Sequence, residues 1–94
     1  MPFQFEWEPE KAIANFAKHG VSFREATEVF GDPLSTTTDD FTHSDEELRY
    51  WTIGVSRKGR LVVVSHTDRG DKIRIIGARR ATRREQQVHE EDPT

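Results

Sequence analysis

Apolar and polar residues alternate along this chain with two different periods, which predict both strands and helices. The range 3–7 alternates aromatic and polar residues, as a half-buried strand does. Apolar residues recur at helical spacing in the ranges 9–19 and 22–30, so two helices are expected next. Further strands are expected at 34–38, 49–56, 61–64 and 72–76, with a helix from Thr82. The pattern predicts an α+β fold, in which a small antiparallel sheet carries two N-terminal helices and one C-terminal helix.

Several residues mark the ends of these elements. Gly20 is expected in the left-handed conformation that ends the first helix. Ser22 with Glu25, and Thr82 with Glu85, have the spacing of a capping box. A single domain is expected over 1–91, and 92–94 is expected to be a disordered tail.

The residues that fill the core are harder to assign. Nine aromatic residues are expected to supply much of its volume, and Trp51 is expected among them. In the strand at 49–56, the odd-numbered residues share one face and the even-numbered residues share the other. Val88 is the only apolar side chain of the last helix, which should therefore pack weakly and move when a partner binds.

Composition excludes some classes of protein. The chain has 94 residues and no cysteine, which excludes disulfides and thiolate sites. No apolar run approaches the roughly 20 residues of a membrane span, and the acidic N-terminus lacks the apolar stretch of a signal peptide. A cytoplasmic protein without a membrane partner is expected.

Charge is distributed unevenly along the chain. Residues 1–56 carry four Lys or Arg against eleven Asp or Glu, a net charge of −7. Residues 57–84 carry ten against two, a net charge of +8, and the remainder adds −4. A basic face on an acidic body indicates a nucleic acid or another anionic partner. The alternative is that the two halves neutralise each other across the fold.

Several ordered motifs resemble those of the BrnT family. They are Phe5-Glu6-Trp7, Lys18-His19-Gly20-Val21-Ser22-Phe23, Arg49-Tyr50, Ile73 to Thr82, and Glu85. The chain departs from the family pattern at Gly77, where relatives carry a small polar residue, and at Val88, in a region where an aromatic residue is common.

The resemblance implies a RelE-like fold and a ribonuclease toxin of a type II toxin–antitoxin system that arrests translation. It implies RNA as substrate, free or on the ribosome. It also implies a BrnA-like ribbon-helix-helix antitoxin, a hetero-oligomer with it, and contact with DNA only through it. The alternative is a non-catalytic module that binds nucleic acid, or that acts as corepressor with a DNA-binding antitoxin. A small metabolic enzyme is a third class, but the chain has no cofactor motif.

Metal-free RNA cleavage needs a group that moves protons and cations that stabilise the phosphorane, which suit histidine and arginine. The predicted catalytic residues are Arg74, His66, Arg79 and Arg49. If Thr67 opposes Lys72 in the 61–76 hairpin, then Lys72, Arg74 and Arg80 share one face, and His66 lies on the other with the valines and isoleucines.

Each assignment has an alternative. Arg74 is the first choice, because a charge between isoleucines is costly unless it faces a site or partner, yet it also suits an ordinary exposed position. For His66, which is flanked by valines and isoleucines, a hydrogen-bonded core histidine is the alternative, and it is the favoured one. Arg79 lies just before a helix N-terminus, itself an anion site, or is simply solvated. Arg49 binds RNA or pairs with the acidic loop.

The predicted RNA-binding residues are Arg80, Lys72, Lys18, His19 and Tyr50. Lys18 and His19 also suit the negative end of the first helix. Tyr50 or Trp51 could stack a base, although Trp51 is expected in the core. The acidic run at 39–47, which includes Phe41 and His43, has no recognised ligand spacing, so a solvated loop is expected there and no metal site.

Overall fold

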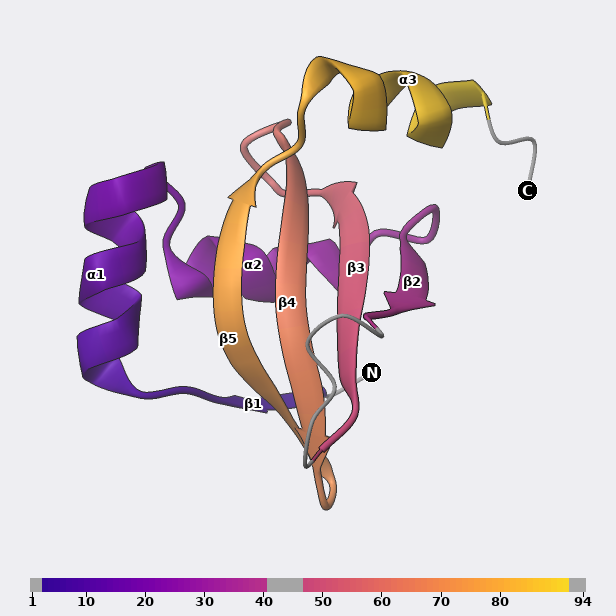
Figure 1. The fold of residues 1–94 in the computed structure, drawn as a ribbon. Coiled ribbons are helices and arrows are strands. Elements are labelled where there is room, and N and C mark those ends of the chain that lie inside the picture. The colour runs from indigo at the N-terminus through magenta and orange to yellow at the C-terminus, as the bar shows by residue number, and fades with distance from the viewer. Residues whose placement is uncertain (1–2, 41–46, 92–94) are drawn as a thin grey trace.

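The computed structural model describes residues 3–40 and 47–91, which form one five-stranded sheet with three helices (Figure 1). The expected tail at 92–94 and most of the expected loop, including Phe41 and His43, lie outside the described residues. The elements in chain order are β1 (Gln4–Glu6), α1 (Pro9–His19), α2 (Phe23–Val29), β2 (Thr36–Asp39), β3 (Arg49–Val55), β4 (Leu61–Arg69), β5 (Lys72–Arg80) and α3 (Arg83–Glu91). None of the described helices is long and apolar enough to cross a membrane.

The strands lie in the order β1-β5-β4-β3-β2. Neighbouring strands are antiparallel except β1, which runs parallel to β5 at one edge. The predicted α+β class is confirmed, with a mixed sheet that is mostly antiparallel. The parallel pair arises because α1 and α2 separate β1 from the rest of the sheet, so the chain returns to the same edge after four more strands.

The hairpin of β4 and β5 differs from the predicted register. Arg69 pairs with Lys72 across a turn in which Gly70 has a φ of 62°, so the pairing of Thr67 with Lys72 was wrong by two residues. A bulge follows between Ser65 and His66, where β5 contains one extra residue.

The bulge decides which side chains of β5 share a face. His66 pairs with Ile75, but Ser65 pairs with Gly77, so Ile76 is the extra residue. Beyond it, side chains of β5 lie on the face opposite to the one that strict alternation would assign. Arg79 therefore shares a face with Ser65, and Arg80, which was expected on the face of Arg74, lies on the other one.

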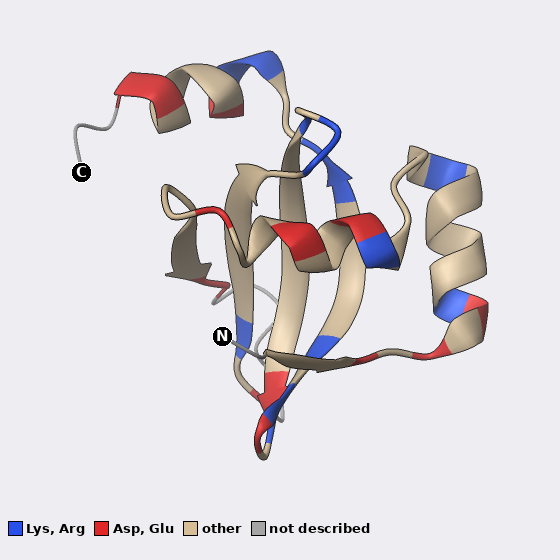
Figure 2. Ribbon diagram, turned by 180° about the vertical axis from the view of Figure 1, so that it is seen from behind, with Lys and Arg blue, Asp and Glu red and all other residues tan. Residues whose placement is uncertain are grey.

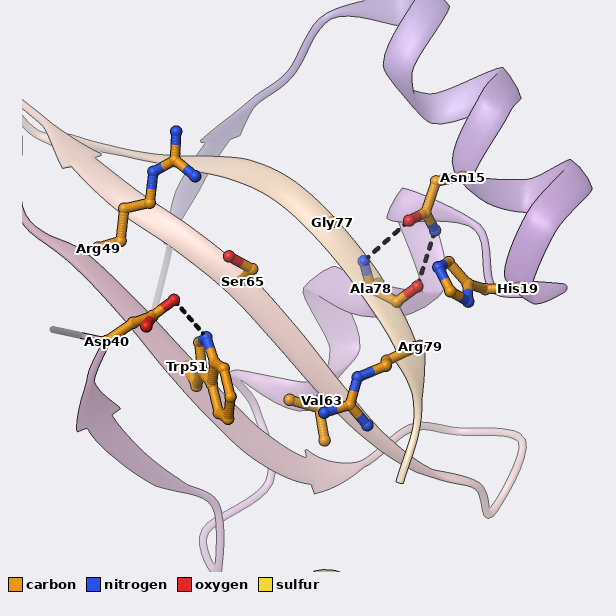
Figure 3. A pocket seen from close by; sticks show the side chains of 10 residues that line it. All are labelled: Asn15, His19, Asp40, Arg49, Trp51, Val63, Ser65, Gly77, Ala78 and Arg79. Atoms are coloured by element: carbon orange, nitrogen blue, oxygen red, sulfur yellow. Dashed lines mark hydrogen bonds between the residues drawn. The ribbon is translucent and has the colours of Figure 1, made fainter. Parts of the chain in front are cut away.

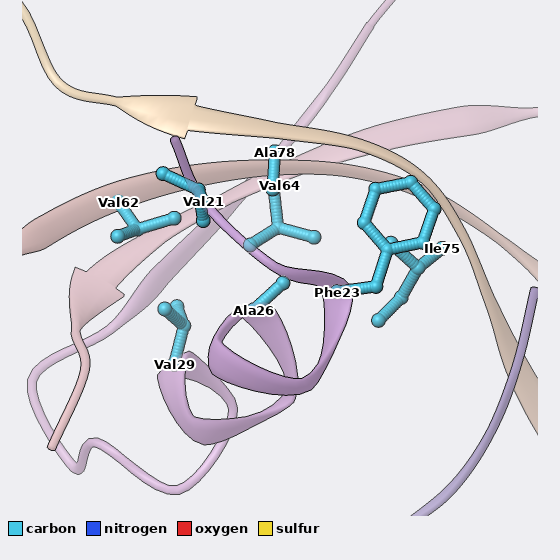
Figure 4. Close-up of a cluster of buried hydrophobic side chains, with 8 residues drawn as sticks. All are labelled: Val21, Phe23, Ala26, Val29, Val62, Val64, Ile75 and Ala78. Atoms are coloured by element: carbon cyan, nitrogen blue, oxygen red, sulfur yellow. The ribbon is translucent and has the colours of Figure 1, made fainter. Parts of the chain in front are cut away.

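The hydrophobic core lies between α2 and the back face of the sheet, defined here as the face that α2 covers (Figures 1 and 4). It consists of Val21, Phe23, Ala26, Val29, Val62, Val64, Ile75 and Ala78. Phe23 is the aromatic residue buried among them, while Phe5, Trp7 and Phe30 pack around it half-buried. Valine and alanine thus fill much of the volume that was assigned to aromatic rings.

The predicted alternation of β3 is confirmed, and its buried face is the polar one. Thr52, Gly54 and Ser56 are buried on the side of the sheet that α2 covers, whereas Trp51 and Val55 are exposed on the other side. Trp51 is 39% exposed, so its assignment to the core was wrong. We call the side that carries Trp51, opposite α2, the front face.

The helix ends follow the predicted capping residues. Gly20 has a φ of 71°, and its N–H donates to the carbonyl of Phe16. Thr82 and Glu85 form a complete capping box, since each side chain accepts from the other residue's N–H. At α2 the Ser22 hydroxyl accepts from the N–H of Glu25, but the Glu25 carboxylate turns elsewhere.

Acidic and basic segments meet at several points of the fold. Buried Glu25 accepts hydrogen bonds from Arg60 and from Ser56, at 2.7 Å for the latter, and the Arg60 guanidinium lowers the pKa of this carboxyl. Other ion pairs join Arg69 to Glu47 and Arg74 to Glu6. Neutralisation across the fold therefore accounts for part of the basic segment. Lys and Arg remain concentrated where β5 ends and α3 begins (Figure 2).

Candidate active site

A pocket of about 260 Å³ opens on the front face (Figure 3). Cross-strand pairing places Trp51 of β3 beside Ser65 of β4, and Ser65 beside Gly77 of β5. One step further along the sheet, Val63 pairs with Arg79. The side chains that line this front pocket are Asn15, His19, Asp40, Arg49, Trp51, Val63, Ser65, Gly77, Ala78 and Arg79.

Arg79 is held in the front pocket from two sides. Its guanidinium donates two hydrogen bonds to the Glu85 carboxylate, at 2.8 and 3.0 Å. It also lies over the Trp51 ring, 6.0 Å from the centroid, which is a cation–π distance. The hydrogen bonds from Arg79 lower the pKa of Glu85 to about 2, so the pair is charged at neutral pH.

Trp51 is itself fixed by a buried carboxylate. The indole Nε1–H donates to Oδ2 of Asp40 at 2.7 Å, and the backbone N–H of Asp40 donates to the carbonyl of Arg49. Asp40 is 6% exposed. The ring therefore has a set orientation between Asp40 and Arg79.

α1 lines one side of the front pocket and contributes His19 to it. Asn15, one turn earlier, accepts from the N–H of Ala78 at 3.2 Å and donates to its carbonyl at 2.9 Å. β1 pairs only with residues 72–74 of β5, so the backbone groups of β5 beyond them have no strand partner on that edge. The Asn15 amide supplies the hydrogen bonds for two of these groups, the N–H and the carbonyl of Ala78. These hydrogen bonds attach the last turn of α1, which contains exposed His19, to the strand that carries Arg79.

Arg74, the first catalytic choice, lies outside this pocket. It pairs with Glu6 in the parallel β1 register, and its guanidinium donates to Glu6 at 2.9 Å and to Glu8 at 3.0 Å. These carboxylates, Glu6 first, raise the pKa of Arg74. The charge of Arg74, which lies between two isoleucines in sequence, is thus neutralised by Glu6 and Glu8 of the same chain.

His66 and Tyr50 lie on the back face, separated from the front pocket by the sheet. His66 is 5% exposed, and its Nε2 lies 2.7 Å from the Thr52 hydroxyl. Its ring stacks on Tyr50 with centroids 5.7 Å apart. Burial lowers the pKa of His66 to about 4, so the ring is neutral at physiological pH. Its surroundings are those of the core histidine that was the alternative.

The remaining predicted RNA-binding residues are dispersed. Lys72 is exposed beside the turn of the hairpin, and Arg80 is exposed at the far end of β5. Lys18 is exposed in the last turn of α1, next to His19 but not in the pocket. Of the nine predicted site residues, the front pocket brings together His19, Arg49 and Arg79.

Seven of the ten lining residues were not among the predicted site residues, and Asn15, Asp40, Ser65 and Gly77 are four of them. A signal for Asn15 was present, because asparagine inside a helix is unfavourable unless its amide has a specific partner. Nothing in the sequence distinguished Asp40 from its neighbours in the acidic run. Ser65 and Gly77 are brought together by the bulge.

Comparisons with known proteins agree with this architecture. The sequence profile described as the ribonuclease toxin BrnT of type II toxin–antitoxin systems matches residues 7–85. A crystal structure of the Brucella abortus ribonuclease toxin BrnT is similar, with a TM-score of 0.64, 21% identity, and coverage of 87% of this chain and 100% of that one. At this identity the structural likeness supports the fold alone. No curated protein sequence matches the chain.

The profile match extends from Trp7, through both N-terminal helices and the whole hairpin, to the Glu85 that holds Arg79. It covers far more than half of the chain, including all of the front pocket. The chain therefore belongs to the BrnT family, the ribonuclease toxins of type II toxin–antitoxin systems.

Proposed function

We propose that this protein is an RNA endonuclease of RelE-like type that works without a metal ion and arrests translation. Residues 1–91 form its toxin domain, which acts in the cytoplasm on RNA, free or on the ribosome. A BrnA-like ribbon-helix-helix antitoxin holds it inactive in a hetero-oligomer and links it to DNA.

One observation carries this proposal. The front pocket gathers two arginines and a histidine from three separate elements: Arg49 from β3, Arg79 from β5 and His19 from α1. Arginine donates planar, paired hydrogen bonds that match phosphate oxygens, and histidine transfers protons near neutral pH. These are the groups that transesterification by the RNA 2′-OH needs.

The proposed roles follow from position. Arg79 and Arg49 bind the scissile phosphate and stabilise the charge that develops on the phosphorane. His19 takes the proton of the 2′-OH while water protonates the departing 5′-oxygen, or His19 protonates the 5′-oxygen while water takes the proton of the 2′-OH. Asp40 positions Trp51, which supports Arg79 from one side.

Arg74 and His66 have a different place in this proposal. Arg74 holds β1 against β5 through its bonds to Glu6 and Glu8. His66 shapes the back face, where its buried ring contacts Tyr50 and Phe30. Both support the sheet on which the pocket is built.

The test is incubation of the purified protein with single-stranded RNA in EDTA. Cleavage should persist and leave a 2′,3′-cyclic phosphate. Activity that disappears with chelation and returns only with Mg²⁺ would refute the metal-independent reaction.

Matched variants locate the site. Arg79→Ala removes charge-assisted bonds at the transition state and should slow cleavage by about a hundredfold, since each such bond is worth about 3 kcal/mol. Arg74→Ala should retain far more activity when compared as folded protein. His19→Ala should be inactive, whereas Lys18→Ala, one residue earlier, should not. A folded Arg74→Ala protein that loses all activity while Arg79→Ala keeps it would move the site to the edge of β1.

The alternative is a non-catalytic corepressor that binds nucleic acid together with its antitoxin. The ion pair between Arg79 and Glu85 favours this corepressor function. Both terminal nitrogens of Arg79 already donate to the Glu85 carboxylate, so they are not free for a phosphate. Single-turnover cleavage with protein in excess separates the two functions. RNA that is bound but remains intact would support the corepressor.

A further inference from the structure

A second hollow lies on the front face, between the sheet and α3. We call it the front groove, and it measures about 640 Å³, within the range of small-molecule sites. Trp51, Ile53 and Val63 form its floor, and Val88 and His89 of α3 line the opposite side. The groove thus has an apolar floor and a helix that buries none of its own residues.

The groove continues the front pocket. Trp51 and Val63 line both hollows, and Glu85, which lines the groove, is bonded to Arg79 of the pocket. A ligand with an anionic group beside Arg79 and a flat apolar group attached to it would occupy both at once. A nucleotide has this form, with its phosphate and base joined through one sugar.

The floor of the groove has the properties of a stacking platform. The Trp51 ring is oriented by its bond to Asp40, so little conformational entropy is lost when a base stacks on it. Around the floor are side chains that can donate to or accept from a base edge, namely Thr36, Thr38, Glu85 and His89. Arg84, also in the lining, adds positive charge that complements the RNA backbone.

We propose that the front groove is a subsite for one unpaired nucleobase, next to the phosphate bound in the front pocket. A base can enter the groove and stack on Trp51 only when it is not paired, so the substrate is a single-stranded segment of RNA. This inference rests on the proposed function and specifies its substrate class.

Binding of non-cleavable strands tests the subsite. The probes are a single-stranded 2′-O-methyl tetranucleotide and the same strand with abasic sugars. Loss of a stacked base should weaken binding by roughly tenfold to a hundredfold. The chain has two tryptophans, and Trp7 packs against Phe23 in the core, so Trp7→Phe leaves Trp51 as the fluorescent reporter. The intact strand should quench it, and the abasic strand should not.

A pair of valine substitutions provides the matched control. Val88 is 63% exposed, so Val88→Trp can fill the groove without disturbing the core, and it should reduce affinity for the intact strand to that of the abasic strand. Val55→Trp adds the same ring at an exposed position outside both hollows and should leave binding unchanged. Circular dichroism confirms that both variants are folded.

The outcomes distinguish the subsite from the function. Equal affinity for intact and abasic strands, with binding still dependent on Arg79, would overturn the subsite and leave the proposed function standing. No binding of either strand and no cleavage would overturn both. If Val88→Trp weakens antitoxin binding and leaves RNA binding unchanged, the groove serves the protein partner and the inference is wrong.

Discussion

Gly54 of β3 packs against Val29 of α2 and against Ser35, and the strand has no room there for a side chain. A Cβ at this position would lie 2.9 Å from Cβ of Ser35 and 2.9 Å from Cγ1 of Val29. Such approaches force backbone or core atoms to move, which typically costs about 1–3 kcal/mol. Gly54→Ala should lower the free energy of unfolding by this amount in urea denaturation.

Gly77 is the matched control for this prediction. It lies in the front pocket, and a Cβ there would meet only Oδ1 of Asn15, at 3.7 Å. Gly77→Ala should be neutral or slightly stabilising, because it reduces the entropy of the unfolded chain. Equal destabilisation by both substitutions would contradict the close packing of α2 on β3.

His66 should make the stability of the protein depend on pH. Burial lowers its pKa from 6.5 to about 4 in the folded state. The unfolded chain therefore binds more protons between these values, and stability is lost as the pH falls from about 6.5 to about 4. The shift corresponds to at most about 3 kcal/mol. Urea unfolding at a series of pH values measures it.

Substitution of the two histidines by glutamine isolates the contribution of His66. His66→Gln should flatten the pH dependence of the unfolding free energy over this window. His19→Gln, the same substitution at an exposed histidine, is the control. An unchanged slope in the His66 variant would assign the dependence to other groups.

At the scale of elements, α3 is joined to the sheet mainly through its first turn. None of its residues is buried, as the sequence predicted from the lone Val88. Glu85 both completes the capping box and binds Arg79, so one side chain begins the helix and fixes it to β5. The pKa of about 2 keeps this contact charged down to about pH 2, and the stability it contributes is lost as the pH falls from about 4.5 towards 2.

Glu85→Gln should therefore loosen α3. Glutamine can still complete a capping box, but it loses the ion pair with Arg79. A partly exposed pair is worth about 0.5–1 kcal/mol, so amide hydrogen exchange in residues 86–91 should accelerate by roughly twofold to fivefold. Glu90→Gln, in an exposed turn of the same helix, is the control. If both variants exchange like the parent, another contact holds α3.

At the scale of the whole molecule, the ion pairs divide the basic segment into two groups. Arg60, Arg69 and Arg74 are engaged by carboxylates of the body. Arg79, Arg80, Arg83 and Arg84 lie close together where β5 ends and α3 begins, with Glu85 against the first of them (Figure 2). This end of the molecule combines positive charge with a loosely held helix, which suits an acidic, amphipathic segment of an antitoxin.

Charge reversal at this end tests the partner surface. Arg79→Glu together with Arg80→Glu should weaken antitoxin binding by at least tenfold and also reduce RNA cleavage, because both ligands compete for the same cations. Calorimetry at several salt concentrations provides the measurement, and binding to the parent should weaken as salt rises. Arg57→Glu with Lys58→Glu, in the turn between β3 and β4, is the control of equal charge.

Unchanged antitoxin affinity in the folded double variant would place the partner surface elsewhere. The structure offers α1, whose apolar stripe is directed away from the core: Ile13 is 72% exposed and Phe16 is 56% exposed. Ile13→Glu and Phe16→Glu would then be the variants that disrupt the complex.

The sequence by itself determined the elements, their caps and the fold class, because these depend on local periodicity and on residues with strong backbone preferences. Helix ends and turns are set by residues that affect the backbone only a few positions away, such as Pro9, Gly20, Gly70 and the capping box of Thr82 and Glu85. The family motifs could also be recognised from the sequence, since they are runs of adjacent residues. His19, Arg49 and Arg79 were all among the predicted site residues, but nothing local separated them from Arg74 or His66.

Only the tertiary structure decided which side chains meet. The extra residue at Ile76 turns Arg79, rather than Arg80, towards the front face, and the pattern of apolar residues does not show a bulge. The parallel return of β1 brings Glu6 to Arg74, its partner 68 positions away. The cover of α2 over the polar side of β3 leaves Trp51 on the front face. Register, strand order and the covered face are properties of long-range packing, and the active-site geometry depends on all three.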